Sequence, residues 1–176
     1  RTAGVEDRTS RSSLENEIKS NKIIGGLVLP TALVHEVRAI NDFAFERVKD
    51  SQKLNTAGTL HPGAKNSQEM LRNFEQRNIR AIKLCSFSQR FSLQDQKTFE
   101  MLERIQEHNI HCEFKFFLIF DTLMSADFYF GSDPAHNTTP ELLGELVKTF
   151  PSINFIGAHM GGLLAPFKDI RTYLKP

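Results

Sequence analysis

The chain has 176 residues, of which 40% are hydrophobic, and its formal net charge is +1. This length and composition predict one globular domain over residues 1–176 and exclude a disordered chain. The near-zero charge argues against a dedicated nucleic-acid surface, and no apolar run approaches the roughly 20 residues that a membrane span needs.

Five apolar runs along the chain have the composition of buried strands. They predict strands over the ranges 23–29, 55–60, 79–85, 112–120 and 153–158. Between them lie amphipathic runs typical of helices. Thr31 is predicted to cap the helix over 32–48, and Asn66 with Glu69 forms a start like a capping box. A further helix is predicted over 93–109, and Thr139 before Pro140 predicts the start of another.

Strand onsets recur about every 30 residues, which is the length of a βα unit. Near-continuous apolar strands that alternate with helices predict an α/β fold with a parallel sheet. Two architectures remain open on this pattern. One is a doubly wound open sheet, which a complete five-stranded flavodoxin-like domain would satisfy. The other is part of a (β/α)8 TIM barrel, whose usual size is about 250 residues.

In both architectures the active site lies at the carboxyl ends of the strands. Four of the five predicted strands end in a polar or ionisable side chain: His61, Lys83 with Cys85, Asp121 and His159. Each has a structural alternative, because His61 precedes a Pro-Gly turn, Lys83 can form a structural ion pair and Asp121 can cap a turn. Cys85 fits the core or the rim better than the role of nucleophile. His159, which closes the fifth predicted strand within "GAHMGG", is the best candidate for chemistry.

The remaining histidines do not lie at the carboxyl end of a predicted strand. His35 and His108 fall within predicted helices, His111 opens a predicted strand at the opposite end of the sheet, and His136 lies in a long loop. The chain also lacks a glycine-rich phosphate loop, an H-E-x-x-H, a C-x-x-C and a G-x-S-x-G. Nucleotide binding and serine-hydrolase chemistry therefore have little support in the sequence.

Three blocks of the chain resemble the second amidohydrolase family, which are TIM-barrel metal-dependent hydrolases with relatives of the aminocarboxymuconate-semialdehyde-decarboxylase type. They are "GTLHPG" (58–63), "IRAIKLCSFSQRFSLQD" (79–95) and "TTPELLGELVKTFPSINFIGAHMGG" (138–162). The resemblance spans roughly residues 22–170 and implies that only the second to the sixth of the eight barrel strands are present. We therefore expect a barrel that is incomplete at both ends.

The resemblance implies a metal role for His159, at the end of the sixth barrel strand. The family commonly has a metal-binding histidine after the fifth strand, where this chain reads "LIFDT" and offers Asp121. His159 and Asp121 are thus the expected metal ligands and catalytic groups, with Lys83 and His61 binding substrate. The family's H-x-H motif and its last aspartate have no counterpart, and "KLCS" stands where "KLHP" is common.

The chemistry that these residues suit is activation of water by a divalent metal, with zinc as the expected ion. The sequence therefore predicts a hydrolase or a decarboxylase (a carbon–carbon lyase) that acts on a small carboxylated or cyclic molecule. The alternative is a non-catalytic or metal-free barrel relative that serves as a binding module. Two cysteines in apolar runs, Cys85 and Cys112, are expected to be free thiols, which fits a cytoplasmic protein. A homodimer is compatible with either function.

Overall fold

The computed structural model describes residues 10–174, and within that range it has a mixed α/β fold with eight α-helices and parallel sheets. The strands are β1 (Gly26–Val28), β2 (Leu54–Thr56), β3 (Gly58–Thr59), β4 (Ala81–Leu84), β5 (Phe117–Phe120) and β6 (Asn154–Gly157). The helices are α2 (Arg11–Ser20), α3 (Val37–Val48), α4 (Ser67–Gln76), α5 (Ser86–Gln89), α6 (Gln96–His111), α7 (Ala126–Phe130), α8 (Pro140–Thr149) and α9 (Phe167–Tyr173). Two short 3-10 turns, η1 (Pro134–His136) and η2 (His159–Gly161), complete the described elements.

All strand pairs are parallel and follow the order of the chain. β1 pairs with β2, and a second sheet has the order β3-β4-β5-β6. The second predicted strand, 55–60, is divided at Ala57 into β2 and β3, so that one half pairs with β1 and the other with β4. The predicted parallel, sequential arrangement of the five strand regions is confirmed.

The division of that strand leaves one edge of β3 without a strand neighbour, and a side chain from α3 takes its place. The amide of buried Asn41 donates to the carbonyl of Thr59 at 2.9 Å and accepts from the Thr59 N–H at 2.8 Å. Asn109 makes the same pair of bonds with Phe116, just before β5. Buried backbone groups need such partners, and these two amides supply them where the ladder ends.

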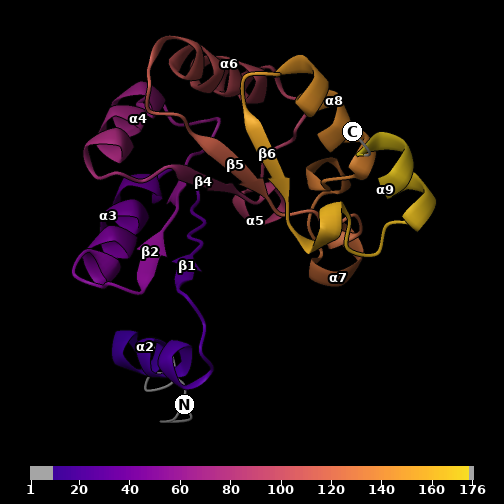
Figure 1. Ribbon diagram of the computed structural model, residues 1–176. Helices are drawn as coiled ribbons and strands as arrows, with labels where there is room; N and C mark the ends of the chain where they lie inside the picture. The colour runs from indigo at the N-terminus through magenta and orange to yellow at the C-terminus, as the bar shows by residue number, and fades with distance from the viewer. Residues whose placement is uncertain (1–9, 175–176) are drawn as a thin grey trace.

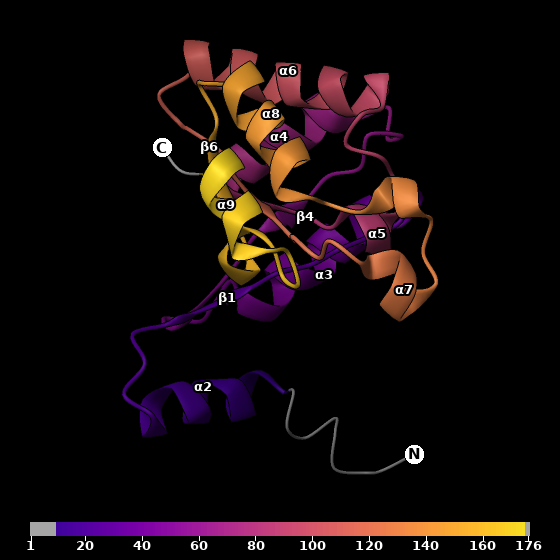
Figure 2. The same ribbon diagram turned by 90° about the vertical axis from the view of Figure 1, so that its right-hand side faces the viewer.

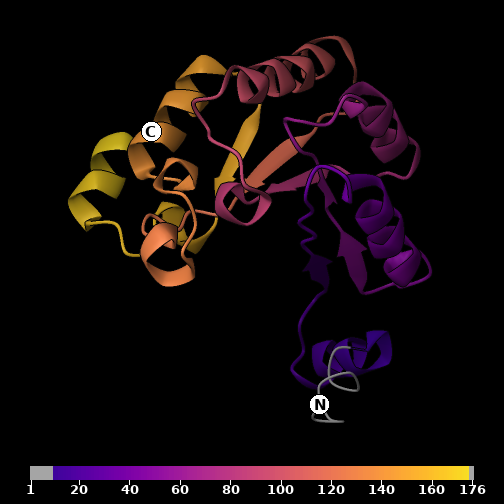
Figure 3. The same cartoon turned by 180° about the vertical axis from the view of Figure 1, so that it is seen from behind.

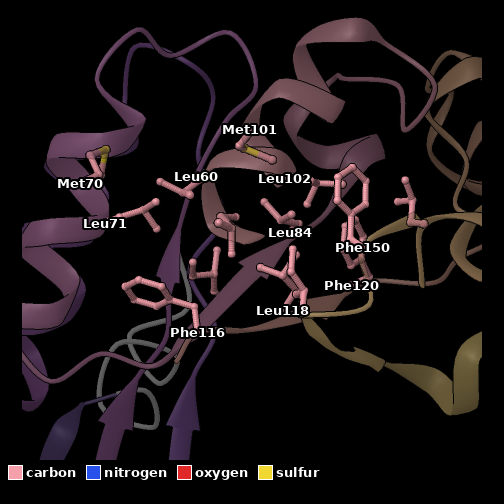
Figure 4. Close-up of a cluster of buried hydrophobic side chains, with 14 of the residues drawn as sticks. Leu60, Met70, Leu71, Leu84, Met101, Leu102, Phe116, Leu118, Phe120 and Phe150 are labelled. Atoms are coloured by element: carbon pink, nitrogen blue, oxygen red, sulfur yellow. The ribbon is translucent and has the colours of Figure 1, made fainter. Parts of the chain in front are cut away.

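Helices α3, α4, α6 and α8 lie side by side along one face of the sheet (Figure 1), and the view from behind shows the same outer arc (Figure 3). Successive parallel strands joined by right-handed crossovers in one direction place their helices on a single face. The main apolar core lies between this face and the helices (Figure 4). Leu60, Leu84, Leu118, Phe120 and Phe150 are among its fully or almost fully buried members.

Several predicted boundaries differ from the structure. Thr31 does not cap a helix, because a turn precedes α3 and the carboxylate of Glu36 accepts from the Leu33 N–H at 3.1 Å. Asn66 is the N-cap of α4 but makes no side-chain capping bond, and the Glu69 side chain pairs with Arg38. Thr139 caps α8 as predicted and accepts from the Leu142 N–H at 3.2 Å.

The prediction that His111 opens a strand was wrong. His111 is the last residue of α6, and the strand begins only at Phe117. His108 and His111 both lie in the last turn of the helix, where basic side chains meet the negative end of the helix dipole. The backbone of Phe116 bonds to the Asn109 side chain, which holds the segment between helix and strand in a turn.

Helix α2 was not predicted, because its sequence is polar and has little apolar periodicity. The hydroxyl of Ser10 accepts from the Ser13 N–H at 3.2 Å at its start. Its single buried residue, Ile18, packs with Val48 and Leu54, and the helix stands apart from the remaining elements (Figure 2). Among residues 10–174, no helix is both long and apolar enough to cross a membrane.

Candidate functional site

Three predicted site residues meet at the carboxyl ends of β4, β5 and β6. Lys83 lies opposite Ile119 in the ladder, and Asp121 follows two residues later on the same face of the sheet. The Asp121 N–H donates to the carbonyl of Leu84 at 2.9 Å, which carries the ladder one residue past the end of β5. His159 begins η2 and is separated from the end of β6 by Ala158 alone. The predicted convergence of these three residues on one rim is confirmed.

Asp121 is the centre of this cluster, and each of its carboxylate oxygens faces a different partner. Lys83 Nζ donates to Oδ2 at 3.1 Å, and His159 Nε2 lies 3.2 Å from Oδ1. Side-chain exposure rises along the series, from 5% for Lys83 through 20% for Asp121 to 45% for His159. The cluster therefore leads from a buried ammonium group to an imidazole that solvent can reach.

Two loops that follow β5 and β6 are fastened to each other beside the cluster. Leu163 donates its N–H to the carbonyl of Thr122 at 2.7 Å, and Met124 donates to the carbonyl of Leu163 at 3.3 Å. The Thr122 hydroxyl donates to the carbonyl of Ala158. Thr122 and Ala158 are the immediate neighbours of Asp121 and His159, so these bonds join the backbone segments that carry the two candidate side chains.

The backbone is left-handed from His159 through Gly161, and this conformation accounts for the glycine at position 161. His159 has φ 51°, Met160 φ 58° and Gly161 φ 85°. Residues other than glycine rarely adopt left-handed backbone angles. Residues with such strained backbone angles cluster at functional sites. A Cβ atom at Gly161 would lie 2.5 Å from Leu174 Cδ1, so a side chain there would also collide with the segment after α9.

Cys85 lies beside the same cluster, in the core or rim position that the sequence predicts. It is buried, at 4% exposure, at the N-terminus of the short helix α5. Burial, followed by the negative charge of Asp121, raises the pKa of the Cys85 thiol to about 11. The thiol is thus protonated at neutral pH and is a poor nucleophile, which agrees with the sequence interpretation.

We expect the free energy of unfolding to fall between pH 9 and 11 through the titration of Cys85. The unfolded thiol, with its ordinary pKa of 9.0, loses its proton in this range while the folded thiol keeps it until about pH 11. Since the unfolded state then binds fewer protons, the loss approaches about 2–3 kcal/mol. Urea unfolding of the wild type and of Cys85→Ala at pH 8 and pH 10.5 measures this loss, which should be smaller in the variant. An equal loss in both proteins would contradict the assignment.

His61 has its ring nitrogens engaged by backbone groups. Its Nε2 donates to the carbonyl of Gln89 at 2.8 Å, and Nδ1 accepts from the Gly63 N–H at 2.9 Å. The ring packs edge-on against Phe91. Gln89 in turn donates to the carbonyls of Ala32 and Leu60 at 3.0 and 2.8 Å. His61 thus holds the turn after β3, as its structural alternative expected, and a substrate-binding role for it stays a prediction.

His136, which the sequence placed in a long loop, ends the turn η1 and lies over α5. Its carbonyl accepts from the hydroxyl of Ser86, which also lies 2.8 Å from the hydroxyl of Thr138. Ser86 and Thr138 are fully buried. The Nδ1 atom of His136 is buried without a partner among the described residues. No sequence motif marked this contact, because it joins residues about 50 positions apart.

A divalent metal would find part of a coordination sphere at this cluster. Asp121 and His159 offer a carboxylate oxygen and an imidazole nitrogen, which are common zinc ligands, whereas a catalytic zinc site takes three protein ligands. Across residues 10–174, no group of three histidine, cysteine, aspartate or glutamate side chains is placed to hold an ion. The donors fit a metal in kind, and a complete site needs at least one further ligand.

Comparison with known proteins adds no assignment. No protein-family model matches the chain, and no curated protein matches it either. The geometry of Lys83, Asp121 and His159 is therefore the basis for a functional proposal.

Proposed function

We propose that the protein is a metal-dependent hydrolase or decarboxylase that acts on a small carboxylated or cyclic substrate. The observation that carries this proposal is the series of contacts from Lys83 through Asp121 to His159. The series lies at the carboxyl ends of three adjacent parallel strands, where α/β proteins bind their ligands. A buried charged pair that ends in an exposed imidazole suits acid–base chemistry better than a purely structural role.

An eight-stranded barrel, with these strands as its second to sixth, is the architecture that belongs to this proposal. Two observations support it over a doubly wound sheet. The strand regions follow one another in sequential order, whereas a doubly wound sheet reverses direction at a switch point. The helices α3, α4, α6 and α8 gather on one face of the sheet (Figures 1 and 3), whereas a doubly wound sheet carries helices on both.

Within this proposal the three residues have separate roles. His159 exposes its ring to solvent, directs Nε2 at Asp121 and has Nδ1 available to take a proton from water or to return it to a leaving group. Asp121 orients the imidazole through Oδ1. Lys83 contacts Asp121 and has only 5% of its side chain exposed, so it is a positioning residue for the carboxylate.

A divalent cation held by Asp121, with His159 acting on its bound water, would supply Lewis acidity and lower the pKa of that water. Titration of metal-stripped protein with zinc in a calorimeter tests this proposal. We expect about one zinc per chain, and we expect Asp121→Asn and His159→Gln each to weaken binding at least tenfold.

His35→Gln is the matched control, since His35 has 72% of its side chain exposed and lies outside the cluster. Zinc binding that both cluster variants retain unchanged would remove the metal from the proposal.

A second candidate function, a metal-free binding module, is favoured by one observation. Both oxygens of Asp121 already face cationic or hydrogen-bonding partners, and a metal would have to compete with the Lys83 ammonium group. This alternative predicts that the wild-type protein binds small carboxylates without zinc and without turnover. The zinc titration, repeated with a turnover assay on small lactones, amides and carboxylated rings, distinguishes the two functions.

A further inference from the structure

A groove of about 470 Å³ opens between α2, β1 and α3, and none of its residues belongs to the cluster around Asp121. Its walls are formed by Arg11, Leu14, Val28, Pro30, Thr31, Ile40, Phe43, Ala44, Arg47, Val48 and Leu54. Eight of these eleven side chains are apolar, and no aspartate or glutamate is among them. The volume lies in the range of small-molecule pockets, about 300–1,000 Å³.

The apolar walls of the groove are incompletely covered. Phe43 is 62% exposed and Leu14 is 38% exposed, while Ala44 and Val48 form a buried floor. α2 contributes a single buried side chain to the fold, Ile18, so it forms one wall of the groove without filling it. Apolar surface in a concavity of this kind is typical of a binding site.

The charge at the groove is positive and comes chiefly from Arg47. Its guanidinium carbon lies 5.4 Å from the centre of the Phe43 ring, and no carboxylate pairs with it in the part of the chain that the structure describes. Arg11, in contrast, is paired with Glu15 at 3.1 Å. An unpaired arginine beside an apolar groove is suited to a ligand with an apolar chain and one negative charge at its end, because the guanidinium can pair with that charge.

We propose that this groove binds an amphipathic monoanion, namely an aliphatic carboxylate of about eight to twelve carbons. The aliphatic chain lies along Leu14, Ile40 and Phe43, and the carboxylate pairs with the guanidinium of Arg47. This site is separate from the proposed active site, so it stands or falls independently of the proposed function.

Calorimetric titration of the purified protein with octanoate and decanoate, below their micelle concentrations, tests the site. We expect saturable binding of one molecule per chain, with affinity rising roughly tenfold for the two added methylenes. Arg47→Gln should weaken decanoate binding about tenfold and leave the binding of neutral decanol unchanged. Phe43→Ser should weaken both ligands, because it removes part of the apolar wall.

Two variants serve as controls. Arg72→Gln, which removes an exposed arginine on α4, and His159→Ala should bind decanoate as the wild type does. Equal affinity for decanoate and decanol, an unchanged Arg47→Gln variant or decanoate binding lost in His159→Ala would each overturn the proposal. So would a dimer, seen by light scattering, that Phe43→Ser dissociates, because a second copy of the chain would then occupy the groove.

Discussion

Replacing Asp121 by asparagine should lower the free energy of unfolding by about 3 kcal/mol at neutral pH. The substitution keeps the shape of the side chain but leaves the Lys83 ammonium group, 5% exposed, without a counter-charge. An uncompensated charge in a low-dielectric interior is one of the few single changes with an effect of this size. Urea unfolding followed by circular dichroism measures the loss.

Asp42→Asn provides the matched control for Asp121→Asn. Asp42 pairs with Arg77 at 2.7 Å, but half of its side chain is exposed, so we expect a loss below about 1 kcal/mol. Adding Lys83→Met to Asp121→Asn should restore most of the lost stability, since the buried charge is then absent. Equal effects of the two aspartate variants would show that Lys83 and Asp121 do not behave as a buried pair.

Replacing His159 by alanine should reduce turnover by a factor of about 10²–10⁴ and change the melting temperature by less than about 3 °C. The large kinetic effect follows from the proposed proton transfer at the imidazole. The small thermal effect follows from the position of the side chain, which is 45% exposed and contacts Asp121 at the rim rather than the core. The measurements are steady-state kinetics on a substrate found by the turnover screen and differential scanning calorimetry.

His35→Ala is the control for this variant, because His35 lies on the surface beside Glu36, away from the cluster. It should leave both turnover and melting temperature unchanged. Intact turnover in His159→Ala with a melting temperature lowered by many degrees would assign His159 a structural role and end the case for catalysis.

The relative positions of Lys83, Asp121 and His159 could be predicted because they depend on one regularity. Each residue ends an apolar run, and parallel strands direct their carboxyl ends to one rim. No contact between particular atoms had to be known for that step. The pairing partner of Lys83 was open in the sequence, since an ion pair and a substrate role both explain a lysine in a buried strand.

Other features could not be predicted because they depend on contacts between distant residues or on unusual backbone angles. Cys85 was placed in the core or rim, and its closeness to Asp121 emerges only when β4 and β5 are aligned. The strand break at Ala57 depends on Asn41, a helical residue whose amide replaces a strand neighbour. Helix α2 has too little apolar periodicity to be recognised, and His111 continues a helix into a stretch that reads as strand.

The bonds between Thr122 and Leu163 have a mechanical consequence for the candidate site and for its redesign. Because the loops after β5 and β6 are hydrogen-bonded to each other, we expect Asp121 and His159 to move together at the rim and to keep their separation. A redesign of one loop that removes these hydrogen bonds would let the distance between Asp121 and His159 fluctuate. A residue such as Leu163, which contributes no side chain to the cluster, would then determine how often the two groups are aligned.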